Sequence, residues 1–296
     1  MEEFGRNGTG VPEAHFVEDE EGATLDSEGA ICRFNTQAGG RLEHYVWRTI
    51  PPRASQHPST RKDQPKLLDL VDPVGGALID HFLPLGTKPD EFAQGTHEEY
   101  GDFANEPYKS QVVNSGGEIR IGLLRDGAIR AGKRTAEVRM AKSAAVRPGS
   151  SDIAVLYRVI NSSTRPLQIL FAVEFNLYAP GLSPFGNDEL RITNYELLES
   201  PPIRHSDEGG EGYYLIDGKQ PADPTFSSSD VSPNATMVAL VNPVEEMALQ
   251  LGWDRECDLL RMPPSEGGTG ARLLAVWRLQ LPPRDNWAMG LWLAPS

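Results

Sequence analysis

The sequence has few cysteines, an excess of acidic over basic residues, and no long apolar run. Only Cys32 and Cys257 occur in 296 residues, too few for a disulfide framework, so the reducing cytoplasm is the expected location. Asp and Glu number 42 against 28 Lys and Arg, a net charge of −14, and both nucleic-acid phosphates and anionic lipid would repel such a chain. No run approaches the ~20 apolar residues of a membrane span. We therefore expect neither nucleic acid nor a membrane as partner.

Helical periodicity is also scarce. The chain holds 29 Gly and 24 Pro, and both residue types destabilise helix interiors. One or two helical turns are predicted over Lys66–Val71, because Pro65 suits a helix start. Strand signals, by contrast, recur along the chain between turn residues. The predicted strands are Ala30–Asn35, Leu42–Trp47, Ala77–Leu83, Glu118–Leu124, Lys133–Met140, Ile153–Ile160, Leu167–Tyr178, Gly212–Ile216, Thr236–Val241, Glu246–Trp253, Ala271–Leu281 and Trp287–Leu293.

These strands predict an all-β fold, a single large antiparallel sandwich. Hairpin turns are predicted at Arg125–Ala128 and at Asp217-Gly218, because Asp-Gly favours tight turns. Residues 1–28 carry nine acidic side chains against Arg6 alone, which is typical of an acidic tail or linker. We therefore expect one β domain over residues 29–296.

Common enzyme motifs are missing. The sequence has no G-x-S-x-G, no H-E-x-x-H, no P-loop and no G-x-G-x-x-G between a strand and a helix. Neither cysteine belongs to a C-x-x-C pair, so a structural zinc site is not expected. From the motifs alone we predict no catalytic residue, no metal ligand and no cofactor.

Two segments nevertheless concentrate polar side chains. Leu78–Phe82 is followed by Thr96–Phe103, and four interpretations stay open for them: an acid–base pair of carboxylates, metal ligands, a sugar-binding surface, or a loop that bonds its own backbone. His81 and His97 with a carboxylate would suit a metal, although the i, i+4 spacing of a helical site is absent. The candidate carbohydrate-binding residues here are Asp80, His81, Glu99, Tyr100 and Asp102, beside the acidic neighbour Glu98.

A third segment, Leu170–Leu177, is an apolar strand that contains Glu174 and Asn176. Alternation places both side chains on one face, opposite Phe171, Val173 and Phe175. An unpaired buried carboxylate would cost several kcal/mol, so these side chains are either paired, on a polar outer face, or in a binding groove. Glu174 and Asn176 are therefore candidate sugar ligands, and Trp47 is a candidate stacking platform because aromatic rings bind sugar faces.

The sequence resembles the C-terminal β-sandwich domain of family-57 glycoside hydrolases, the α-amylase and 4-α-glucanotransferase group. The matching segments follow the family order over roughly residues 15–293. They are Gly39–Glu43, Leu78–Phe82, Glu99–Phe103, Val173–Leu177 and the closing strands from Val276 to Trp292.

The resemblance implies a galactose-mutarotase-like β-supersandwich. In the family, a separate N-terminal (β/α) barrel carries the reaction, and no such barrel fits before residue 30 of this chain. The resemblance therefore implies a non-catalytic accessory domain that binds α-glucan or another oligosaccharide, or completes a separately encoded barrel. Two alternatives stay open: a mutarotase-like epimerase or glycosidase that uses His81 and Glu174, and a purely structural interaction module.

Overall fold

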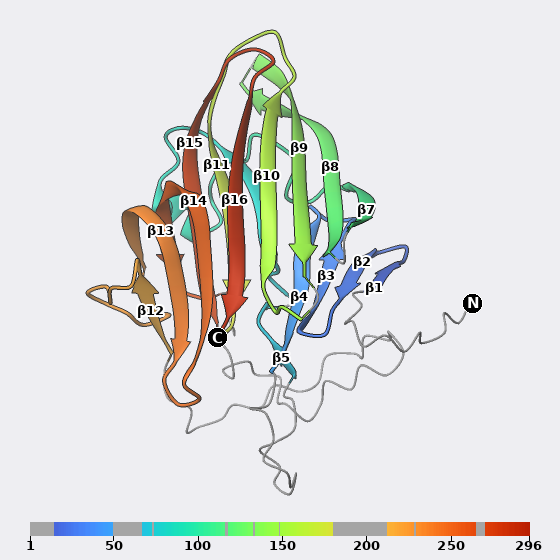
Figure 1. The fold of residues 1–296 in the computed structure, drawn as a ribbon. Coiled ribbons are helices and arrows are strands. Elements are labelled where there is room, and N and C mark those ends of the chain that lie inside the picture. Colours follow the sequence, from blue (N-terminus) through green and yellow to red (C-terminus); the bar gives the residue numbers. More distant parts are fainter. Residues whose placement is uncertain are drawn as a thin grey trace, which may run out of the picture.

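The computed structural model describes residues 15–49, 67–72, 74–115, 118–132, 134–147, 149–179, 212–227, 229–264 and 270–296. Within these residues the chain forms sixteen strands and one five-residue helix (Figure 1). The elements are β1 (His15–Glu18), β2 (Gly22–Asp26), β3 (Ala30–Asn35), β4 (Arg41–Arg48), β5 (Leu67–Asp69), β6 (Ala77–Leu83), α1 (Pro89–Ala93), β7 (Lys109–Ser115), β8 (Glu118–Ala131), β9 (Arg134–Val146), β10 (Ile153–Asn161), β11 (Leu167–Leu177), β12 (Tyr213–Ile216), β13 (Asp230–Asn242), β14 (Met247–Met262), β15 (Ala271–Leu281) and β16 (Asn286–Pro295).

All strands join one antiparallel sheet, which confirms the predicted all-β architecture. Its main path runs β1-β2-β3-β4-β6-β11-β15-β14-β16-β10-β9-β8-β7. The long strand β14 pairs with β16 through Leu249–Trp253 and with β15 through Asp258–Met262, so it belongs to both halves of the sheet. No helix of the described residues is long and apolar enough to cross a membrane.

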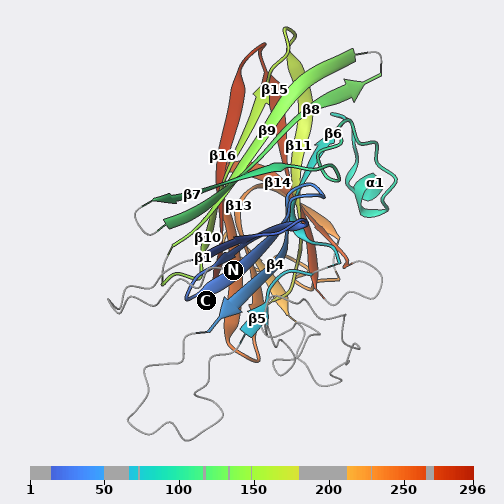
Figure 2. The same ribbon diagram turned by 90° about the vertical axis from the view of Figure 1, so that its right-hand side faces the viewer.

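The sheet folds over on itself around one main core. The Phe171 ring of β11 lies 5.8 Å from that of Tyr157 on β10 and 5.6 Å from that of Trp287 on β16, although these strands are far apart along the path of the sheet. The two halves of the sheet therefore face each other (Figure 2). Aromatic and aliphatic side chains fill the space between them.

One of the two predicted hairpin turns is wrong. Asp126 and Gly127 lie inside β8, where Gly127 pairs with Val138 of β9. The β8–β9 turn comes later, around Gly132, whose positive φ of 60° suits glycine. Gly127 is needed in the strand for another reason: a Cβ there would lie 2.7 Å from the Phe103 ring. The Asp217-Gly218 turn is present, with Ile216 and Lys219 exchanging both backbone hydrogen bonds.

Two further expectations are corrected at the N-terminal side. Part of the predicted acidic tail is structured, because residues 15–18 and 22–26 form β1 and β2, and β2 pairs with β3. The acidic turn between them is held by Asp19, which accepts hydrogen bonds from the Glu21 and Gly22 amides. Residues 1–14 lie outside the described residues. The predicted helical turn at 66–71 is strand β5 instead, paired with β4.

Candidate functional site

The candidate site lies where β6 and β11 pair, on the face turned away from the main core. The register places His81 opposite Ala172 and Glu174 opposite Ile79. Phe82 and Val173, their neighbours in sequence, point into the main core, so alternation turns His81 and Glu174 to the other face. Both side chains are nevertheless at most 10% exposed, because the chain between β6 and β7 covers them.

His81 bridges two carboxylates. Its Nε2 lies 3.1 Å from Oε2 of Glu174, and its Nδ1 lies 3.0 Å from Oε2 of Glu99. Each carboxylate has a second partner that fixes it. Arg272 of β15 donates from Nε to Oε1 of Glu174 at 2.7 Å, and the Phe82 amide donates to Oε1 of Glu99 at 2.6 Å. These five residues form a continuous chain of charge-assisted hydrogen bonds.

The pKa shifts follow from this geometry. Burial alone would lower the pKa of His81, but the hydrogen bonds that its ring donates to Glu174 and Glu99 outweigh this effect and raise that pKa to about 9. Burial would raise the pKa of Glu174, yet its bonds to His81 and Arg272 lower it to about 2. At neutral pH the His81 ring is therefore an imidazolium that lies between Glu174 and Glu99. The Arg272 guanidinium lies at the Glu174 end of this series of hydrogen bonds.

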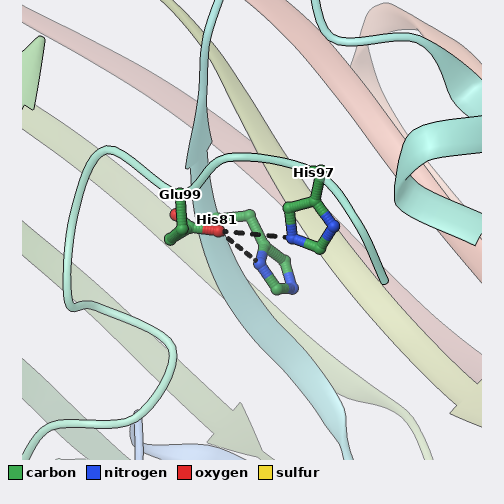
Figure 3. Close-up of side chains that lie close together, drawn as sticks. All are labelled: His81, His97 and Glu99. Carbon is green, nitrogen blue, oxygen red and sulfur yellow. Dashed lines mark hydrogen bonds and ion pairs between the residues drawn. The ribbon is translucent and has the colours of Figure 1, made fainter. Parts of the chain in front are cut away.

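A short helix covers this chain of charges. Figure 2 shows α1 on the outside of β6. Phe92 of α1 meets the His81 ring edge-on at 5.0 Å and stacks on the His97 ring at 4.4 Å. His97 lies beside Glu99 and His81 (Figure 3), with Nε2 3.8 Å from Oε2 of Glu99. Burial, and then the charge of His81, lower the pKa of His97, which favours the neutral form of this ring. We call His81, His97, Glu99, Glu174 and Arg272 the polar cluster.

Two of the predicted sugar ligands, Asn176 and Asp80, have hydrogen-bond partners within the protein. Asn176 is buried, and its Nδ2 donates to the Gly76 carbonyl at 3.0 Å. Asp80 is fully buried on the opposite face of β6 from His81, where it pairs with Lys142 at 2.9 Å and accepts from Tyr108 at 2.8 Å. Asp80 therefore shares no surface with the polar cluster.

The remaining candidates form no hydrogen bond or ion pair with the polar cluster in the described part of the chain. Asp102 pairs with Arg125 at 2.8 Å. Tyr100 packs against the main core, and its carbonyl accepts from the Arg130 amide at 2.7 Å. Trp47 lies on β4 opposite Ala30 and packs partly buried against the main core. Of the eight predicted residues, the structure thus brings together His81, Glu99, Glu174 and, through a 3.4 Å contact with Glu174, Asn176.

Sequence reasoning missed Arg272 and Phe92. Arg272 is 98 residues from Glu174 along the chain, so no local motif joins them. Its alternation with Ala271 and Leu273, both buried, was the only signal that Arg272 points away from the main core. Phe92 gave no signal, since it lies in a five-residue helix between turns.

A second surface lies on the outer face of β16. Trp292 is 40% exposed, and a Cβ on Gly252 of the neighbouring strand would lie 2.0 Å from its ring. The ring therefore packs directly on the glycine backbone. On the other side, β10 pairs Ala154 with Trp292, and Leu156 two residues on is 47% exposed. Together these residues form an exposed aromatic surface, the Trp292 platform.

Comparison with known proteins identifies the relatives. Residues 71–194 match the family model "Alpha-amylase/4-alpha-glucanotransferase, C-terminal". The chain resembles the C-terminal domain of these enzymes. The match covers β6, α1 and β11, and therefore every residue of the polar cluster except Arg272. No curated protein matches the sequence.

Solved structures show the same fold. The 4-α-glucanotransferase of Thermococcus litoralis aligns with a TM-score of 0.56 and 15% identity, over 96% of this chain but only 39% of that enzyme. A galactose mutarotase-like protein of Clostridium acetobutylicum aligns with a TM-score of 0.62 and 10% identity, over 97% of this chain and 99% of its own. A putative aldose 1-epimerase of Escherichia coli K12 gives 0.52 and 10%, over 96% and 99%. The galactose-mutarotase-like β-supersandwich is thereby confirmed.

Proposed function

We propose that this chain is a non-catalytic domain that binds α-glucan and serves a separately encoded catalytic barrel. The observation that carries the proposal is the family match over residues 71–194, to a domain that belongs to α-amylase and 4-α-glucanotransferase. The chain spans about 39% of the length of the Thermococcus enzyme.

The bonding of His81 and Glu174 favours a non-catalytic role over a mutarotase-like one. A general acid and base act by exchanging protons with the substrate. Here both ring nitrogens of His81 face carboxylates, and Glu174 is held by His81 and Arg272. The two groups neutralise each other and are at most 10% exposed, which argues against epimerase or glycosidase chemistry at this pair.

The Trp292 platform is the surface best suited to a glucan. Sugar rings present apolar C–H faces that stack on aromatic rings, and the Trp292 side chain is 40% exposed. The polymer is neutral, so the net charge of −14 does not oppose binding. The sugar candidates of the polar cluster are poorer, because their polar atoms already have protein partners.

Affinity electrophoresis tests the proposal. The purified chain runs through native gels that contain glycogen or maltodextrin, and we expect retardation relative to a gel without polysaccharide. Trp292→Ala is expected to reduce the apparent affinity about three- to tenfold, the equivalent of about 0.5–1.5 kcal/mol of stacking. The matched control is Val113→Ala, an exposed apolar residue on β7, which should behave as the unsubstituted chain.

Two results would overturn the proposal. Equal mobility with and without every α-glucan removes the binding function. Faster mutarotation of fresh α-glucose in the presence of the chain, measured by polarimetry, replaces the non-catalytic role with the epimerase alternative.

A further inference from the structure

Three potential metal ligands converge in the polar cluster. One ring nitrogen each from His81 and His97 and one oxygen of Glu99 lie within 4.8 Å of one another. Figure 3 shows that both imidazoles turn a nitrogen toward the same Glu99 oxygen. Glu99 Oε2 is central, 3.0 Å from His81 Nδ1 and 3.8 Å from His97 Nε2. The three residues come from strand β6 and from the loop after α1, so the fold itself assembles the group.

The surroundings of the group hold two of its members in the orientation of metal ligands. A metal-bound histidine usually donates its second ring N–H to a carboxylate, which fixes the ring. His81 does this through Nε2 to Glu174, and Glu174 is fixed in turn by Arg272. The second oxygen of Glu99 accepts from the Phe82 amide, which leaves Oε2 to face the two imidazoles.

His97 supplies an independent observation. Its side chain is only 16% exposed, and among the described residues neither ring nitrogen has a hydrogen-bond partner within range; Nδ1 is buried without one. An imidazole that is this little exposed normally has a hydrogen-bond partner for at least one ring nitrogen. Its Nε2 instead points at the Glu99 oxygen, as a ligand would, and Phe92 stacks on the ring to hold it there.

We propose that His81, His97 and Glu99 bind one divalent first-row transition ion. Two imidazoles and one carboxylate favour such an ion over Ca²⁺ or Mg²⁺, which prefer oxygen ligands. Three protein ligands leave at least one coordination position to water. On binding, the ion replaces the proton on Nδ1 of His81, which faces Glu99. That proton is released to solvent. Metal–ligand bonds of about 2.0–2.2 Å require the three ligand atoms to move closer together. A rotation of the His97 ring achieves this, and no hydrogen bond to another described residue restrains that ring.

Zinc titration of the full chain tests the site. After removal of metal with a chelator, the chain is titrated with ZnCl₂ by isothermal calorimetry, and Co²⁺ is added in a parallel sample to record its visible absorption. We expect one Zn²⁺ per chain and Co²⁺ bands typical of nitrogen and oxygen ligands. His97→Ala and Glu99→Gln should each weaken Zn²⁺ by at least the 10–100-fold that outer-sphere substitutions produce.

The control is His44→Gln, which breaks another histidine–carboxylate pair, His44 with Asp69, and should leave Zn²⁺ affinity unchanged. Circular dichroism melts establish that each variant is folded; Glu99→Gln keeps an oxygen for the Phe82 amide, so it stays informative if His97→Ala does not fold. No stoichiometric Zn²⁺ binding, or equal binding by the folded Glu99→Gln variant, would overturn the proposal. The proposal does not depend on glucan binding, since Trp292→Ala should retain Zn²⁺.

Discussion

Lys142 of β9 and Asp80 of β6 form an ion pair of 2.9 Å between side chains that are 1% and 0% exposed. The two strands lie in different halves of the folded sheet, so the pair crosses the main core. Lys142 also donates to the carbonyls of Gly39 at 2.9 Å and Leu78 at 2.7 Å. Leu78 has a positive φ of 59°, at the irregularity where β6 shifts register against β11. The ammonium thus holds the bulge that precedes Asp80 and His81.

Replacing Lys142 with Met should therefore be strongly destabilising. The substitution leaves the Asp80 carboxylate buried with Tyr108 as its remaining partner, and breaking a buried ion pair from one side costs about 3–5 kcal/mol. Urea unfolding followed by fluorescence measures the change. The double variant Lys142→Met with Asp80→Leu should recover part of the loss, because it removes the uncompensated charge. A single variant as stable as the parent would show that the pair contributes little.

The His44–Asp69 pair predicts a pH dependence of stability. Nδ1 of His44 lies 2.7 Å from Oδ2 of Asp69; burial lowers the pKa of His44, but the bond and charge of Asp69 outweigh it and raise that pKa above 6.5. A raised folded-state pKa means that the stabilisation is complete below the unfolded pKa and lost as pH rises through the folded one. The difference in unfolding free energy between the parent and His44→Gln should therefore shrink as pH rises.

The measurement is a pair of urea titrations at each pH between about 5.5 and 9, a range that spans the ordinary histidine pKa of about 6.5. Other titrating groups are common to the two proteins, so they cancel in the difference. A difference that stays constant over this range would contradict the assignment.

The strands were largely predictable because their information is local. Ala30–Asn35, Ala77–Leu83 and Ala271–Leu281 are found with the predicted bounds, since alternation and turn residues report on each strand by itself. The misplaced β8–β9 turn shows the limit. Asp126-Gly127 has the composition of a turn, but Gly127 is in the strand because the Phe103 ring packs against it, a tertiary contact that no local pattern contains.

The site was predictable in part for the same reason. His81, Glu99 and Glu174 were recognised from composition, whereas the choice of Asp80 beside His81 conflicted with strand alternation, which turns neighbours to opposite faces. Arg272 and the cover by Phe92 depend on contacts between distant segments. The approach of His97 to Glu99 depends on the course of the loop after α1. Local sequence therefore indicated which groups are present but not which of them meet.

Gly127→Ala and Gly132→Ala test why glycine is needed at each of these two positions of the β8–β9 hairpin. At Gly127 the added methyl group would lie 2.7 Å from the Phe103 ring, so we expect overpacking that costs about 1–3 kcal/mol. At Gly132 nothing lies within 4 Å, and only the positive φ of 60° opposes the substitution, at about 1–2 kcal/mol. Adding Phe103→Leu should relieve the first variant and not the second. Thermal unfolding of the four proteins measures this; equal effects of Phe103→Leu in both backgrounds would contradict the packing explanation.

Gly252→Ala should disrupt the Trp292 platform without removing the indole. The new methyl group would lie 2.0 Å from the ring, so the ring must leave the sheet surface, and the overpacking should cost about 1–3 kcal/mol. Gly86→Ala is the matched control, because nothing lies within 4 Å of a Cβ there. Trp292 becomes more accessible in the variant, so acrylamide should quench the fluorescence more strongly. If glucan stacks on the Trp292 ring while that ring lies flat on the sheet, Gly252→Ala should reduce gel retardation as Trp292→Ala does. Retardation that survives in Gly252→Ala would place the glucan elsewhere on the chain.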